Sequence, residues 1–132
     1  MNAIAPYTEQ EHPPSRYSPA SAFALVVGVL LLVEGLWGLA SPVVFGVLTT
    51  NLPHAIIHTV LGLYGIAVGL GRDPAGYLLF LGALLLAVGL LYFVPMATAM
   101  LTTLLNVNTA VALVNIVAGS LALVLRGFDR GW

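Results

Sequence analysis

Residues 51–69 read Asn-Leu-Pro-His-Ala-Ile-Ile-His-Thr-Val-Leu-Gly-Leu-Tyr-Gly-Ile-Ala-Val-Gly. This stretch predicts one long apolar helix and shows which of its faces is buried. Asn51 is an expected N-cap, and Pro53 fits the first helical turn, where its missing N–H costs nothing. His54 and His58 are four residues apart, so a helix places both rings on one face.

Three glycines continue the face that carries the histidines. They are Gly62, Gly65 and Gly69. Small residues let the backbones of membrane helices approach closely. We therefore predict that these glycines pack against a neighbouring helix, and that the histidines point into a bundle and away from lipid.

The composition indicates that lipid solvates most of the chain. Of its 132 residues 60% are hydrophobic and 7% are charged, whereas soluble domains carry about 25% charged residues. The formal net charge of −1 leaves no basic surface for nucleic acid. The absence of cysteine excludes disulfides, thiolate metal ligands and thiolate nucleophiles.

Four apolar stretches are long enough for helices that cross a bilayer, which need roughly 20 residues. We predict an all-α integral membrane four-helix bundle over residues 21–126. A polar, proline-rich cytoplasmic tail (1–20) precedes it and a short cytoplasmic tail (127–132) follows. The predicted helices cover residues 22–40, 53–71, 75–95 and 108–125, and uncharged loops cover residues 41–52 and 96–107.

Four spans place all four arginines on one side of the membrane. These are Arg16, Arg72, Arg126 and Arg130. The two predicted loops on the other side contain no Lys or Arg. The positive-inside rule then puts both termini in the cytoplasm.

The two halves of the chain resemble each other. The glycine-flanked stretch 28–36 matches stretch 82–90 in its glycine and leucine positions. Downstream, Asn51, His54, His58 and Gly62 fall opposite Asn108, Val111, Asn115 and Gly119. We predict a duplicated two-helix unit, with a pseudo-two-fold axis along the membrane normal.

Four polar side chains form the predicted site. At a rise of about 1.5 Å per residue, Glu34, His58 and Asn115 reach similar depths, while His54 lies nearer the surface. An ionisable group inside a membrane costs about 2.5 to 3.5 kcal/mol on insertion scales and is by default a functional hypothesis.

Three interpretations of this site stay open. The first is a structural hydrogen-bond cluster that joins three helices. The second is a metal or haem site formed by His54, His58 and Glu34, because imidazole and carboxylate groups are common metal ligands. The third is a pathway for protons or a small solute. No serine or threonine has the partners that nucleophilic catalysis needs, so we predict no enzyme activity.

The pattern Asn51-x2-His54-x3-His58-x3-Gly62 resembles that of a family of small four-helix bacterial membrane proteins catalogued as a domain of unknown function. The resemblance covers about residues 22–126. It implies a multi-pass protein of the bacterial inner membrane and brings no activity with it. The second half departs from the family pattern, because Val111 and Asn115 stand where His or Asp is usual. This departure argues against a symmetric two-site metal function.

Taken together, the sequence predicts an accessory or structural subunit of a larger membrane complex. The expected partners are the lipid bilayer and other membrane proteins or further copies of this chain, and no cofactor is required. We also predict that the tail formed by residues 1–20 lies along such a partner, because it has too little apolar surface to order itself.

Overall fold

The computed structural model describes residues 18–130. Within them it contains five α-helices and one short β-hairpin, which confirms the all-α class. The elements are α1 (Pro19–Gly38), β1 (Val43–Val44), β2 (Leu48–Thr49), α2 (Leu52–Gly71), α3 (Ala75–Leu91), α4 (Pro95–Leu105) and α5 (Thr109–Arg130).

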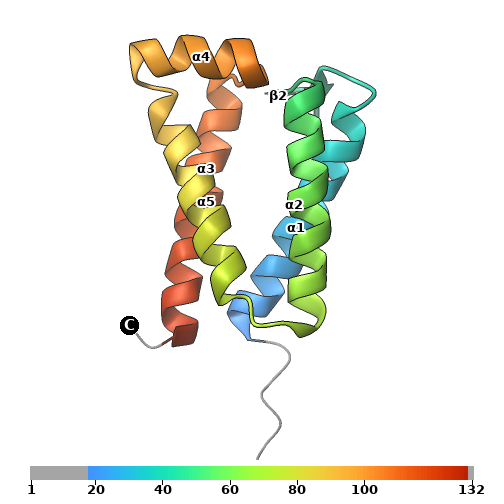
Figure 1. The fold of residues 1–132 in the computed structure, drawn as a ribbon, viewed down its shortest axis with the longest axis vertical. Helices are drawn as coiled ribbons and strands as arrows, with labels where there is room; N and C mark the ends of the chain where they lie inside the picture. The colour runs from blue at the N-terminus through green and yellow to red at the C-terminus, as the bar shows by residue number, and fades with distance from the viewer. Residues whose placement is uncertain (1–17, 131–132) are drawn as a thin grey trace, which may run out of the picture.

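The helices form two antiparallel pairs that stand side by side (Figure 1). Helix α1 packs along α2, and α3 packs along α5, with far fewer contacts between the pairs. The β-hairpin and α4 lie at one end of the molecule, which we call the α4 end. The start of α1, the turn between α2 and α3, and the end of α5 lie at the opposite end (Figure 1).

Three of the described helices, α1, α2 and α5, are long and apolar enough to cross a membrane. The number becomes four if α3 and α4, which are bent by 116° relative to each other, count as one broken span. Large apolar side chains cover the outside of these helices, and Val60 and Val117 are each 60% exposed. This surface is consistent with a membrane protein.

The predicted loop over residues 96–107 is wrong, because Pro95–Leu105 form α4. This segment has no glycine, and its only proline sits in the first turn, where proline is tolerated. The residue before a proline is pushed away from helical geometry, and Val94 has extended angles of φ −95° and ψ 120°. Helix α3 therefore stops at Leu91, before the predicted end at residue 95, and the chain turns sharply into α4.

Other element boundaries also differ from the prediction. Helix α1 begins at Pro19, inside the predicted tail, because the Ser18 side chain caps it by accepting from the Ser21 N–H. Helix α5 continues past residue 126 to Arg130. The expected loop over 41–52 contains the β-hairpin. The predictions for residues 1–17 and 131–132 lie outside the described residues.

Glycines allow backbone contact within each helix pair. A Cβ atom added to Gly28 of α1 would lie 2.9 Å from the Gly62 carbonyl oxygen of α2. In the second pair, a Cβ atom added to Gly82 of α3 would lie 3.0 Å from the Gly119 carbonyl oxygen of α5. Gly65 and Gly69 also face α1, so all three glycines predicted to pack lie at a helix interface.

The two pairs meet around a buried apolar cluster that includes Ala24, Leu78 and Leu81. Next to it, the Tyr77 hydroxyl of α3 donates a 2.9 Å hydrogen bond to the Leu61 carbonyl oxygen of α2. Near the opposite end, Arg126 Nε donates to the Ala75 carbonyl oxygen at 3.2 Å. The apolar cluster and the Tyr77 bond hold α1 and α2 against α3 and α5, whereas the Arg126 bond joins α5 to α3 within one pair. The polar side chains at the α4 end form a separate site.

Candidate functional site

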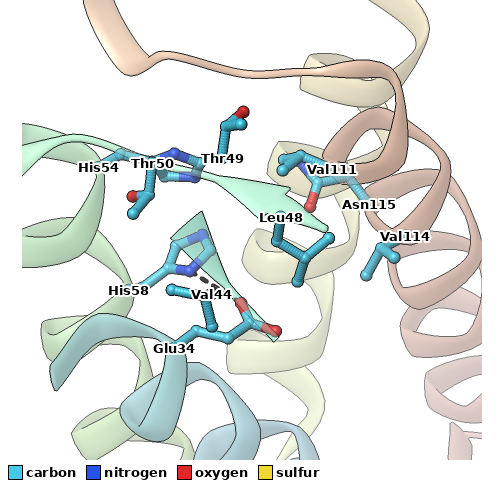
Figure 2. Close-up of a pocket in the computed structure, with 10 residues that line it drawn as sticks. All are labelled: Glu34, Val44, Leu48, Thr49, Thr50, His54, His58, Val111, Val114 and Asn115. Atoms are coloured by element: carbon cyan, nitrogen blue, oxygen red, sulfur yellow. Dashed lines mark ion pairs between the residues drawn. The ribbon is translucent and has the colours of Figure 1, made fainter. Parts of the chain in front are cut away.

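A small polar pocket lies between the two helix pairs near the α4 end (Figure 2). It has a volume of about 20 Å³. Figure 2 shows Glu34, His54, His58 and Asn115 around this pocket, so all four residues of the predicted site border one space. The other lining residues are Val44, Leu48, Thr49, Thr50, Val111 and Val114.

The Glu34 carboxylate pairs with the His58 ring between α1 and α2. The distance from Glu34 Oε2 to His58 Nδ1 is 3.0 Å, and the side chains are 16% and 10% exposed. The carboxylate accepts from the ring, so Nδ1 of His58 carries a hydrogen. The other ring nitrogen, Nε2, points away from Glu34 (Figure 2).

His54 connects α2 to the end of α4. Its Nδ1 lies 2.9 Å from the Leu105 carbonyl oxygen. A carbonyl oxygen can only accept, so Nδ1 of His54 also carries a hydrogen. The His54 and His58 ring centroids are 4.3 Å apart, with an interplanar angle of 78°.

Asn115 reaches the same pocket from the second helix pair. The residue is 6% exposed, and among the described residues its side chain has no hydrogen-bond partner. The structure therefore brings Glu34, His58 and Asn115 together but bonds only Glu34 to His58. The predicted three-helix hydrogen-bond cluster is incomplete in this respect.

A second group of polar side chains joins the two helix pairs at the α4 end, and we call it the polar clasp. It consists of four side chains that donate hydrogen bonds to backbone carbonyl oxygens across the pairs. The bonds are Thr49 to Asn106 at 2.6 Å, Asn51 to Leu104 at 2.9 Å, Asn106 to Thr50 at 2.8 Å and Asn108 to Val47 at 2.9 Å.

The clasp has a clear physical role, because the last carbonyl groups of any helix lack partners within that helix. Asn51 and Thr49 supply donors to the end of α4. Asn51 and Asn108 also cap α2 and α5, by accepting from the N–H groups of His54 and Val111. The sequence predicted the Asn51 cap, but it gave no signal for Thr49 or Asn106, since their partners are about fifty residues away in the chain.

The ligand set of His54, His58 and Glu34 does not form one metal-binding group. The described residues contain no group of three His, Cys, Asp or Glu side chains that could hold a metal ion. The physical reason is that the Glu34 carboxylate is engaged with Nδ1 of His58. A haem is also too large for a pocket of about 20 Å³, which is little more than the space of one water molecule.

A larger cavity lies between α1 and α5 and has a volume of about 400 Å³. We call it the apolar groove. It was not predicted from the sequence, because it depends on how the two helix pairs are placed. Its lining is entirely apolar: Phe23, Val26, Val27, Leu30, Leu113, Val114, Val117, Ala118 and Leu121.

Comparison with known proteins gives no further guide to this site. No protein-family model, no curated protein and no solved structure matches the chain. The resemblance to the small four-helix membrane family therefore stays a prediction.

Proposed function

We propose that the chain is a four-span protein of the bacterial inner membrane with both termini in the cytoplasm. The support is the position of the charges. Arg72 lies in the turn between α2 and α3, and Arg126 lies near the end of α5, at the same end of the molecule (Figure 1). Helix α3 has 17 residues, which is at the lower limit of the roughly 17–25 residues of a span. Helix α4 would then lie at the outer surface.

We also propose that the two helix pairs are copies of one unit. Equivalent contacts recur in both. Gly28 approaches the Gly62 carbonyl in the first pair, and Gly82 approaches the Gly119 carbonyl in the second. The polar clasp also supports a duplication. The Asn51 side chain donates to the Leu104 carbonyl oxygen, and its counterpart Asn108 donates to the Val47 carbonyl oxygen. Leu48-Thr49-Thr50 and Leu101-Thr102-Thr103 match in sequence, but one lies in and after β2 and the other in α4.

As to activity, we propose a non-catalytic structural subunit of a larger membrane complex. The apolar groove carries this proposal. Membrane proteins pack their helices closely, and a furrow of about 400 Å³ between two spans has to be filled by something apolar. We assign this role to a transmembrane helix of a different subunit.

The shape of the groove favours a helix as its occupant. On α1 it is lined at positions 23, 26, 27 and 30, and on α5 at positions 113, 114, 117, 118 and 121. These spacings follow the i+3 and i+4 rows of each helix. Such rows form ridges, and a third helix packs its own ridge into the furrow between them. The groove has no polar atom in its lining, so van der Waals contact would supply the attraction.

The test uses a photo-crosslinking amino acid at Val117 in the groove, with the same amino acid at Val60 on α2 as the matched control. Both positions are 60% exposed. In native membranes we expect the label at Val117 to capture an apolar transmembrane segment of one other protein, identified by mass spectrometry, and the label at Val60 to capture none. Adducts to lipid alone, or to a second copy of this chain, would contradict the proposal.

A substitution in the groove gives an independent readout. Leu30→Trp fills the furrow without removing a hydrogen bond, so we expect the partner to be lost on co-purification while the chain itself remains folded. Val60→Trp should keep the partner. The alternative of a proton or solute pathway has no specific observation in its favour.

A further inference from the structure

The two histidines of the pocket share a hydrogen-bonding arrangement. Each ring uses Nδ1 to donate, His54 to the Leu105 carbonyl oxygen and His58 to the Glu34 carboxylate. In a neutral ring the remaining nitrogen, Nε2, is then an acceptor with a free lone pair. Within the part of the chain that the structure describes, neither Nε2 has a hydrogen-bond partner.

This arrangement matches the way proteins prepare histidines for metal ions. A metal-binding histidine almost always donates its second ring nitrogen to a carboxylate or a backbone carbonyl, which fixes the tautomer and orients the ring. Both kinds of acceptor are present here. The spacing of four residues on one helix is also the spacing with which two histidines bind one metal ion in zinc sites.

The charge of the pocket points in the same direction. Glu34 is the only acidic residue between Pro19 and Gly71, and it lies within a helix long and apolar enough to cross a membrane. An anionic group in that environment is costly. A divalent cation bound to the histidine that Glu34 orients would offset this charge.

We infer that the pocket binds one divalent transition-metal ion through Nε2 of His54 and Nε2 of His58. Glu34 and the Leu105 carbonyl act behind the histidines as positioning groups. The volume of about 20 Å³ is little more than the space of one water molecule, which is enough for one metal ion. The amide of Asn115, which has no hydrogen-bond partner among the described residues, faces this ion from the second helix pair.

The position of Asn115 strengthens this assignment. In the proposed duplication His58 and Asn115 are equivalent, as are His54 and Val111, and all four residues line the pocket. The second helix pair therefore presents two ligand positions to the same space, one filled by an amide and one by an apolar side chain. The two histidine ligands of the single ion therefore both come from the first helix pair, and the site is not a symmetric site of four histidines.

The experiment measures Zn²⁺ binding to the purified full-length chain in detergent, after treatment with a chelator, by isothermal titration calorimetry. We expect one Zn²⁺ per chain. His54→Ala and His58→Ala should each abolish this binding. His12→Ala is the matched control, because it removes the third histidine of the sequence and should leave the affinity unchanged. Glu34→Gln should weaken binding by about 10–100-fold, the usual effect of changing a group behind a ligand.

Asn115→His keeps the test informative even if an alanine variant fails to fold, because it removes no hydrogen bond from the structure. A third imidazole facing the pocket should tighten Zn²⁺ binding by about tenfold or more, since imidazole is a better zinc ligand than an amide. The inference is overturned if the wild-type chain binds no more Zn²⁺ than a His54→Ala/His58→Ala double variant. It is also overturned if Asn115→His leaves the affinity unchanged, because the pocket would then not be the binding site.

Discussion

A Cβ atom at position 62 would lie 2.8 Å from the Gly28 carbonyl oxygen of the neighbouring helix. That separation is too short for any real Cβ contact, and the atom it meets belongs to the backbone, so no side chain can rotate away to make room. Gly62 is therefore required by the close approach of α1 and α2. The same helix contains Gly71, around which a Cβ atom would meet nothing within 4 Å, so close packing is confined to one face.

The first prediction concerns this residue. Gly62→Ala should push α1 and α2 apart and lower the stability of the detergent-solubilised protein by about 1–3 kcal/mol, the usual range for overpacking. Thermal unfolding followed by circular dichroism measures the effect. Gly76→Ala is the matched control in α3, since its Cβ would meet open space and alanine has the higher helix propensity. An unchanged unfolding temperature for Gly62→Ala would contradict the described helix contact.

Helix α4 is held by its C-terminal end. None of its residues is buried, and Met96 is 88% exposed. Burial therefore contributes little to fixing this helix on the molecule. Its last carbonyl groups accept from Asn51, His54 and Thr49, and the helix ends at Asn106, whose φ of 50° is left-handed and closes the helix.

The second prediction follows at the scale of this element. Thr49→Val removes the hydroxyl that donates to the Asn106 carbonyl and keeps the shape of the side chain. We expect faster hydrogen–deuterium exchange of the amides in residues 98–106, and a loss of about 0.5–1.5 kcal/mol of stability. Ser41→Ala removes a local bond to Val43 and should leave exchange in α4 unchanged. Equal effects of the two variants would show that the clasp does not hold α4.

At the scale of the whole molecule, the two ends differ in their charge and in the elements that form them. The turn with Arg72 and the last turns of α5 with Arg126 lie at one end (Figure 1). The β-hairpin and α4, which contain no charged residue, lie at the other. This asymmetry is what the positive-inside rule uses to orient a membrane protein.

The third prediction is the orientation itself. A reporter fused after Arg126 should give a cytoplasmic signal, and a reporter inserted within residues 43–50 should give an exterior signal. Replacing Arg72 and Arg126 together with glutamine halves the number of arginines on the proposed cytoplasmic side and should reduce the fraction of correctly oriented chains. A cytoplasmic signal from the insertion at 43–50 would refute the proposed four-span topology.

Local patterns in the sequence were enough for the properties that depend on one helix at a time. The apolar runs predicted α1, α2 and α5 to within a few residues, because a helix that faces lipid must be apolar over its whole length. The four-residue spacing of His54 and His58 predicted that both rings share one face. The row of Gly62, Gly65 and Gly69 predicted which face of α2 packs, because glycine lets the backbone of a neighbouring helix approach closely.

Tertiary structure alone decided the features that depend on distant parts of the chain. The α4 segment looked like a loop, since uncharged residues without apolar periodicity do not reveal a helix whose end is bonded to Asn51 and Thr49. The sequence predicted Glu34, His54, His58 and Asn115 at related depths. It could not predict that the Glu34 carboxylate contacts Nδ1 of His58, or that the Leu105 carbonyl oxygen accepts from His54. It also could not predict the apolar groove between α1 and α5. The physical reason is that hydrogen-bond partners and cavities are fixed by the placement of the two helix pairs relative to each other. That placement depends on contacts between residues about fifty positions apart.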